Sequence, residues 1–260
     1  MNLDLSDKNA LVCGASAGIG AASARALAAL GARVTLVARN AEKLTAVLQS
    51  LDNQEEAHDF LVADFSNPEN LKAALAELPE DRNYHILINN TGGPKGGPIY
   101  SAAPEEFTQA FAQHLVCNQL LSQALVPGMQ KDGYGRIINI ISTSVKQPID
   151  GLGVSNTIRG AVANWAKTLA NELGPSGVTV NNVLPGFTAT DRLADIVKNA
   201  SKRFQKTEEE AAAFMRQLVP SRRFAEPEEI ANAVAFLASP AASYINGINL
   251  PVDGGRTKSL

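Results

Sequence analysis

The stretch from Leu11 to Gly20 reads LVCGASAGIG, and an alanine-rich segment follows it to Leu30. Apolar residues run up to Cys13, and the glycines come immediately afterwards. A strand, a glycine-rich turn and a helix in this order let the backbone approach a pyrophosphate, which the free N–H groups and the positive end of the helix attract. The pattern therefore predicts a dinucleotide-binding turn. Its expected contact residues are Gly14, Ser16, Gly18, Ile19 and Gly20.

Short apolar or β-branched runs alternate with longer helical stretches through the rest of the chain. The expected strands are Asn9–Cys13, Arg33–Ala38, Asp59–Val62, His85–Asn89, Arg136–Ile141, Val178–Leu184 and Gly247–Val252. The expected helices are Gly18–Leu30, Ala41–Leu51, Asn70–Leu78, Pro104–Gln130, Val154–Leu173 and one that begins at Pro227. Such alternation forms a parallel sheet through right-handed crossovers, with helices on both faces. We expect a Rossmann-like, doubly wound α/β fold with seven parallel strands in three α/β/α layers.

The length and net charge of the chain limit the classes of protein to which it can belong. The 260 residues suit one dinucleotide-binding domain spanning 1–260. A net charge of −3 gives no electrostatic reason to expect nucleic acid or an anionic membrane surface as a partner. The polar start does not resemble a signal peptide, and no apolar run reaches the roughly 18 residues of a membrane span. Cys13 and Cys117 are too few for a metal cluster, so we expect reduced thiols, no metal and a cytoplasmic location.

The most polar stretch, Lys198–Glu210, interrupts the alternation late in the chain. It comes after a strand, and α/β proteins bind their ligands at the carboxyl ends of strands. We expect residues of about 188–222 to form a lid over the substrate. A solvated surface helix is the alternative.

The end of the second strand bears on the choice of dinucleotide. An NAD site places an acid there to bind the ribose hydroxyl, whereas this chain has Arg39 and no acid. A guanidinium binds a 2′-phosphate that a carboxylate would repel. We therefore expect NADP, with NAD as the alternative.

Four further motifs occur in order along the chain. They are Asp64–Phe65, Asn89–Gly92 (NNTG), Pro185–Thr190 (PGFTAT) and the closing segment Arg223–Gly255. Together with the glycine turn, they resemble the short-chain dehydrogenase/reductase family over nearly the whole length. The resemblance implies further cofactor contacts from Asp64, Phe65, Asn90, Gly92, Pro185, Gly186, Thr188 and Thr190. It also implies a homodimer or homotetramer.

The catalytic pattern departs from that family, which uses Asn, Ser, Tyr and Lys. Ser142 takes the place of the serine, but the Tyr-x-x-x-Lys motif is replaced by Ser155-x-x-x-Arg159. Where the asparagine is expected, the triplet is Gln-His-Leu, with His114 at its centre. The chain resembles a divergent subgroup similar to 3-oxoacyl-(acyl-carrier-protein) reductases.

Three functions fit these substitutions. In the first, an NADP-dependent carbonyl–alcohol oxidoreductase uses Ser142 and Ser155 to hydrogen-bond the substrate oxygen. Arg159 stabilises the developing charge, and His114 or a water delivers the proton, because a serine hydroxyl is a much weaker acid than a phenol. In the second, the protein is an NADP-binding sensor or partner subunit without redox activity. In the third, it is an isomerase or dehydratase.

Two details of the first function have alternatives. Arg159 either acts on the substrate, holds the cofactor ribose or pairs with Asp150. With Lys95 and Lys146 it suggests a carboxylate- or phosphate-bearing substrate, unless these lysines are ordinary surface residues. If a phenol from Tyr100, Tyr134 or another subunit lay beside the nicotinamide, it would donate the proton, and the mechanism centred on Ser142 would not apply.

Overall fold

Seven parallel strands form one sheet in the order β3-β2-β1-β4-β5-β6-β7 in the computed structural model, which describes residues 1–53, 55 and 57–259. The strands are β1 Asn9–Cys13, β2 Arg33–Ala38, β3 Asp59–Val62, β4 Ile86–Asn89, β5 Gly135–Ile140, β6 Val178–Pro185 and β7 Asn249–Val252. The predicted doubly wound sheet is confirmed, with strand ends that differ from the prediction by no more than two residues. The order reverses between β1 and β4, so a crevice for a ligand opens at their carboxyl ends.

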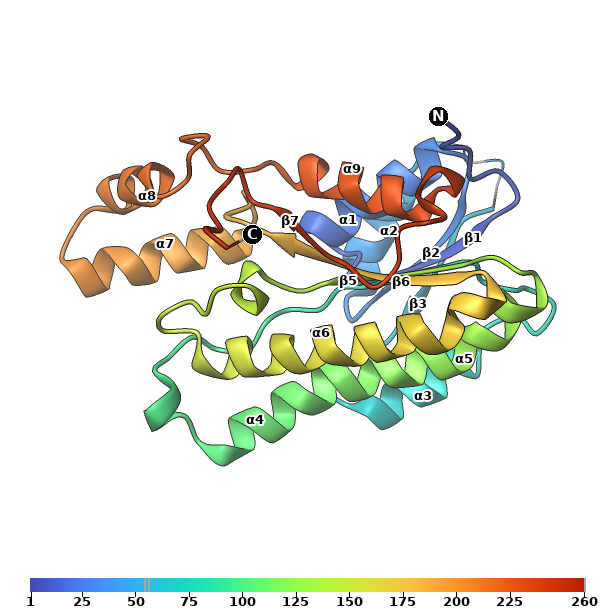
Figure 1. The fold of residues 1–260 in the computed structure, drawn as a ribbon, viewed down its shortest axis with the longest axis horizontal. Coiled ribbons are helices and arrows are strands. Elements are labelled where there is room, and N and C mark those ends of the chain that lie inside the picture. The colour runs from blue at the N-terminus through green and yellow to red at the C-terminus, as the bar shows by residue number, and fades with distance from the viewer. Residues whose placement is uncertain (54, 56, 260) are drawn as a thin grey trace.

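Helices cover both faces of the sheet, as the three-layer prediction requires (Figure 1). The helices are α1 Gly18–Ala29, α2 Ala41–Gln49, α3 Pro68–Leu75, α4 Pro104–Phe111, α5 Cys117–Lys131, α6 Gly153–Leu173, α7 Asp191–Phe204, α8 Glu208–Gln217 and α9 Pro227–Ala238. One apolar cluster joins α1, α2 and α9 to the sheet, and a second joins α3, α5 and α6 to its other face. None of the described helices is long and apolar enough to cross a membrane.

The segment predicted as one helix over Pro104–Gln130 is divided in the structure. A π-helical turn, η3 (Ala112–Val116), separates α4 from α5. Periodicity in the sequence could not reveal this turn, because it inserts a single widened turn into an otherwise continuous helix. The π turn carries His114, whose side chain is buried.

A row of asparagine amides crosses the sheet from β4 to β7. Asn89 donates to Asn139, Asn139 to Asn182 and Asn182 to Asn249, each over 2.8 Å. These residues are register partners in neighbouring strands, and the first three are buried. Because a buried amide without a partner is costly, any shift in register would break the whole row. The row therefore fixes the relative positions of the strands that carry the site.

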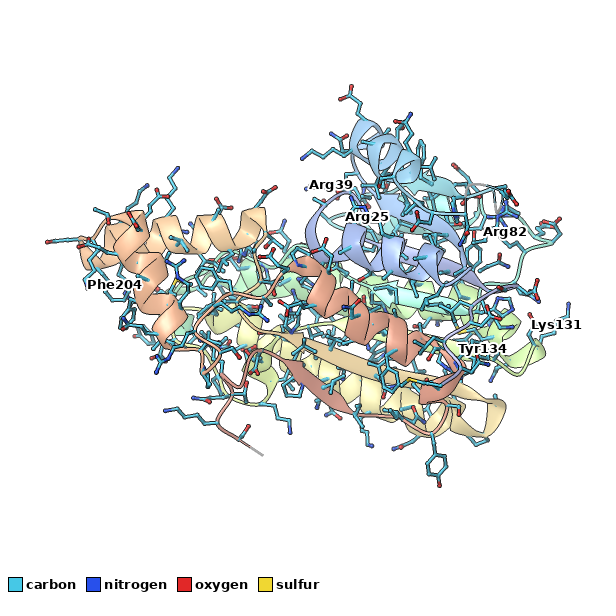
Figure 2. The ribbon with its side chains drawn as sticks, turned by 90° about the horizontal axis from the view of Figure 1, so that it is seen from above. Arg25, Arg39, Arg82, Lys131, Tyr134 and Phe204 are labelled. Atoms are coloured by element: carbon cyan, nitrogen blue, oxygen red, sulfur yellow. The ribbon has the colours of Figure 1, made fainter. Side chains whose placement is uncertain are left out.

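The pair α7 and α8 extends beyond the sheet at one end of the molecule (Figure 1). These helices pack on each other through Leu193, Val197, Ala211 and Met215. Figure 2 shows Phe204 at the far end of the pair and Tyr134 at the opposite end of the molecule. The expected lid, residues 188–222, contains both helices.

Candidate active site

The glycine turn after β1 leaves no room for side chains. Gly14 and Gly18 have positive φ angles of 61° and 54°. A Cβ on Gly14 would collide with the carbonyl oxygen of Asn90, and one on Gly20 with the carbonyl oxygen of Gly14. Helix α1 starts after Ala17, which offers no side-chain cap to the first N–H groups. The turn thus combines a tight backbone with uncapped helical N–H groups, which fits a pyrophosphate.

Segments from two other strands close over this turn. The Asn90 amide, after β4, lies 3.4 Å from the carbonyl oxygens of both Cys13 and Gly14. The Thr190 methyl group, after β6, lies 3.1 Å from the position of a Cβ on Gly18. The structure therefore brings together Gly14, Gly18, Asn90 and Thr190, which the sequence placed in one cofactor site.

The residues expected near the adenosine end lie where β2 and β3 finish. Arg39 Nη1 and Asp64 Oδ1 are 4.0 Å apart, and 73% of the Arg39 side chain is exposed (Figure 2). The Ser66 N–H, helped by the charge of Arg39, lowers the pKa of Asp64. Phe65 lies in the core, and its carbonyl accepts from Cys117 Sγ at 3.4 Å, so its side chain packs against the sheet and its cofactor contact stays a prediction. Ser16 is half-buried.

The loop after β6 is held tightly against the chain after β7. The Gly186 N–H donates to Val252 O over 3.0 Å, and a Cβ on Gly186 would lie 2.7 Å from Asp253 Cα. The buried Thr188 hydroxyl donates to Gly186 O over 3.3 Å. These contacts hold the peptide of Gly186 at the carboxyl end of β6, beside the crevice. A Cβ on Gly92 would have nothing within 4 Å of it, so the backbone after β4 is open.

A cleft of about 1470 Å³ opens at this edge of the sheet. Its walls come from the loops after β4, β5 and β6 and from α7 and α8. Two acids, Asp150 and Asp195, face it, against a larger set of cations. The cations are Lys95, Arg192, Lys198, Lys202, Arg203, Lys206 and Arg256. The cleft is therefore positively charged in a protein of net charge −3.

None of the chain's four tyrosines, all of which the structure describes, lines this cleft. Tyr100 is fully exposed, and the Tyr134 hydroxyl donates to Ala238 O over 2.7 Å at the opposite end of the molecule (Figure 2). Neither tyrosine therefore contributes to the wall of the cleft in the single chain.

Ser142 lies in the cleft wall, directly after β5. Its Oγ accepts a hydrogen bond from the Ser144 N–H over 3.1 Å. Because Oγ is the acceptor in that bond, the Ser142 hydroxyl proton remains available for a substrate oxygen. Ser155 is half-buried in the first turn of α6, and Arg159 follows one turn later on the same side of the helix.

Arg159 is buried, with only 8% exposed. Its Nη1 donates to Ile140 O, at the end of β5, over 2.7 Å. The alternative in which Arg159 pairs with Asp150 is wrong: Asp150 is exposed, and no ion pair joins these two described residues. Burial, and after it the charge of Arg192, lowers the pKa of Arg159 to about 10, so it stays charged at neutral pH.

His114 is 3% exposed, and its Nδ1 lies 2.7 Å from the Thr91 hydroxyl. Burial, and then the charge of Arg159, lowers the pKa of His114 to about 3. The ring is therefore neutral at pH 7, and it holds no imidazolium proton to give to a substrate. Its Nε2 is buried without a partner among the described residues.

Two cations of the cleft were missed in the sequence. Arg192 follows the PGFTAT motif, and Arg256 lies near the end of the chain. Charged residues on predicted loops and helices are common, and no sequence signal separates these two from surface arginines. Only the fold brings them to the edge where β5 and β6 end.

Comparison with known proteins agrees with this architecture. Residues 14–257 match the protein family described as Enoyl-(Acyl carrier protein) reductase. The 3-oxoacyl-[acyl-carrier-protein] reductase FabG of Vibrio cholerae is 35% identical over 256 residues, which cover 97% of this chain and 98% of that protein. The NADPH-dependent reductase BacG of Bacillus subtilis is 31% identical, over 98% of this chain and 100% of that protein. The crystal structure of L-sorbose reductase from Gluconobacter frateurii, complexed with NADPH and L-sorbose, matches with a TM-score of 0.92 at 32% identity over 100% of both chains.

The sheet order, the glycine turn and the motifs around it define a class of oxidoreductases that bind a dinucleotide at the carboxyl edge of a parallel sheet. Within that class, the chain belongs to the short-chain dehydrogenase/reductase family.

Proposed function

We propose that this protein is an NADP(H)-dependent oxidoreductase that interconverts a carbonyl and an alcohol at a site centred on Ser142. The observation that carries the proposal is the position of Ser142 in the wall of a large cleft, at the sheet edge that also holds the glycine turn. Relatives that are named as NADPH-dependent reductases or are bound to NADPH support the choice of cofactor.

The residues of the crevice fit a dinucleotide. The turn at Gly14–Gly20 would hold the pyrophosphate, Arg39 the 2′-phosphate, and Asn90, Gly186 and Thr188 the nicotinamide end. When bound, the nicotinamide supplies or accepts the hydride. Among the described residues, the exposed guanidinium of Arg39 forms an ion pair with Asp64 alone, at 4.0 Å, so it can turn toward a phosphate.

Ser142 would donate a hydrogen bond from its hydroxyl to the substrate oxygen as negative charge develops there. The buried charge of Arg159, which is held on Ile140 O, favours that negative charge from a fixed position. His114 is neutral at pH 7, and no tyrosine lines the cleft, so the transferred proton comes from water. Ser155 would add a second hydroxyl to the substrate site.

Absorbance of NADPH in a stopped-flow instrument, over a library of aldehydes and ketones, tests this function. We expect oxidation of NADPH with at least one carbonyl and loss of most of that rate in Ser142→Ala. Tight NADPH binding without turnover of any carbonyl would favour the sensor or partner-subunit function. Consumption of substrate at constant NADPH absorbance would favour an isomerase or dehydratase.

Two structural roles accompany this function. Residues 188–222 would act as a lid, since α7 and α8 form a wall of the cleft. The chain would also form a homodimer or homotetramer through α4, α5 and α6, where Phe111 is 44% exposed. Sedimentation of the wild type and of Phe111→Glu tests the second role. A monomer for the wild type would contradict it.

A further inference from the structure

Two arginines from different helices converge on the backbone of Gly93. Arg159 comes from α6 and Arg192 from the first turn of α7. The Nη2 atoms of Arg159 and Arg192 lie 3.6 and 3.8 Å from the point that a Cβ on Gly93 would occupy. Because glycine has no side chain, that point is open, and a small group placed there would contact both guanidinium groups.

Backbone carbonyls hold both arginines in this arrangement. Arg159 Nη1 donates to Ile140 O over 2.7 Å, and Arg192 Nη2 donates to Pro94 O over 2.9 Å. Carbonyl oxygens orient the guanidinium groups but leave their charges uncompensated. Within the described part of the chain, no carboxylate forms an ion pair with either of them.

Arg159 carries a buried charge that an anion would balance. The residue is only 8% exposed, and its Nε is buried without a hydrogen-bond partner in the part of the chain that the structure describes. A buried cation without a counter-charge is strongly disfavoured, and a second cation nearby adds repulsion. The charge of Arg192 indeed contributes to the lowered pKa of Arg159. A bound anion would relieve both costs.

We propose that Arg159 and Arg192 bind a carboxylate of the substrate, so that the protein acts on oxo acids and the corresponding hydroxy acids. This inference rests on the proposed function, since Arg192 and Ser142 line the same cleft. The planar N–H groups of two guanidiniums match the paired oxygens of a carboxylate. In a 2-oxo acid the carboxylate is bonded to the reacting carbonyl carbon, so Arg159 would bind the carboxylate and also stabilise the developing alkoxide.

A matched pair of probes tests the inference on the full chain loaded with NADP. The probes are 2-oxo-4-phenylbutanoate and its ethyl ester, which differ in the carboxylate charge. Calorimetry should give a lower Kd for the acid than for the ester. Arg192→Met should raise the Kd of the acid about 10- to 100-fold, the range for loss of a hydrogen bond to a charged group, and change that of the ester far less.

A second variant, Gly93→Asp, supplies a carboxylate from the protein itself beside Arg159 and Arg192. The backbone of Gly93 does not have a positive φ, and nothing lies closer than 3.6 Å to its Cβ position, so the structure accommodates Gly93→Asp. The new carboxylate should pair with the arginines and remove the preference for the acid. The neutral control of nearly equal size, Gly93→Asn, should retain most of that preference, and both variants should bind NADPH as the wild type does.

The results distinguish failure of the carboxylate site from failure of the proposed reductase activity. Equal affinity of the wild type for acid and ester, or equal effects of Arg192→Met on both, overturns the carboxylate site even where carbonyls oxidise NADPH. A loss of NADPH affinity in Arg192→Met as large as the loss of acid affinity overturns it too, and assigns the arginine to the cofactor. Preferred binding of the acid without oxidation of NADPH by any carbonyl supports the carboxylate site and overturns the proposed reductase.

Discussion

The cofactor turn and the catalytic end of the crevice share one sheet edge but differ in how closely they follow the family. Gly14, Gly18 and Asn90, which the family motifs predict as cofactor contacts, lie together in one tightly packed turn. Around Ser142, the phenol and the ammonium of the family are absent, and a buried guanidinium and a neutral imidazole stand nearby. Backbone geometry limits which residues can occupy the glycine turn. Around Ser142, the proposed chemistry limits the choice of side chains.

This difference explains why substitutions are tolerated near Ser142 and not at the glycines of the cofactor turn. A side chain on Gly14 or Gly20 would collide with backbone atoms, so the turn tolerates no substitution. Ser155 and Arg159 lie in a regular α-helix, α6, whose backbone needs no particular side chain at these two positions. We infer that new chemistry arises at the second region while the first continues to bind the same cofactor.

The largest effect on cofactor binding is expected from Gly14→Val, which tests the geometric constraint. The positive φ and the collision with Asn90 O should distort the turn and raise the Kd for NADPH about 100-fold or more, or ~2.8 kcal/mol. Fluorescence titration with NADPH measures the change. Gly160→Ala is the matched control, because nothing lies within 4 Å of its Cβ position. Normal NADPH binding by Gly14→Val would show that the turn is not the phosphate site.

Ser142→Ala tests whether the region around Ser142 acts in turnover and not in cofactor binding. Loss of one donor to a developing oxyanion costs roughly 100- to 1000-fold in kcat. The Kd for NADPH should stay within about twofold, because Ser142 Oγ bonds only the Ser144 N–H among the described residues. Single-turnover kinetics and NADPH titration give the two values. Equal losses of binding and turnover would mean that Ser142 belongs to the cofactor region.

Arg39→Ala should affect the choice of cofactor without affecting the chemistry. Removal of a guanidinium from a 2′-phosphate should weaken NADPH about 10-fold to 100-fold and leave NADH nearly unchanged. Competition titrations with both cofactors at two salt concentrations measure this, and the exposed position of Arg39 predicts a smaller difference at high salt. Equal weakening of NADH would contradict a 2′-phosphate contact.

The buried side chain of His114 makes the stability of the protein depend on pH. Its pKa in the folded protein, about 3, lies below the ordinary value of 6.5, so the unfolded chain binds the proton more readily. The contribution is complete above pH 6.5 and is lost as the pH falls toward 3, at up to ~1.4 kcal/mol per pH unit. Denaturant unfolding of wild type and His114→Gln across this window measures it. Parallel curves for the two proteins would show that the imidazole is not buried.

Some features of the site were accessible from local sequence, and others were not. The divided helix at Ala112–Val116 escaped detection because a π turn leaves the apolar periodicity almost intact. The sequence predicted a cofactor contact for Phe65 from its place in a motif but did not reveal that its side chain packs in the core. Asn139 was read only as part of a strand, although its amide links two neighbours across the sheet.

The sequence by itself determined the seven strands of a doubly wound sheet and predicted the dinucleotide turn, because apolar periodicity and glycine spacing act over a few neighbouring residues. Tertiary structure alone decided that Arg192 joins Arg159 beside Gly93 and that burial lowers the pKa of His114 to about 3. Charge and burial depend on residues far apart in the chain, and the fold must bring them together before either has its effect.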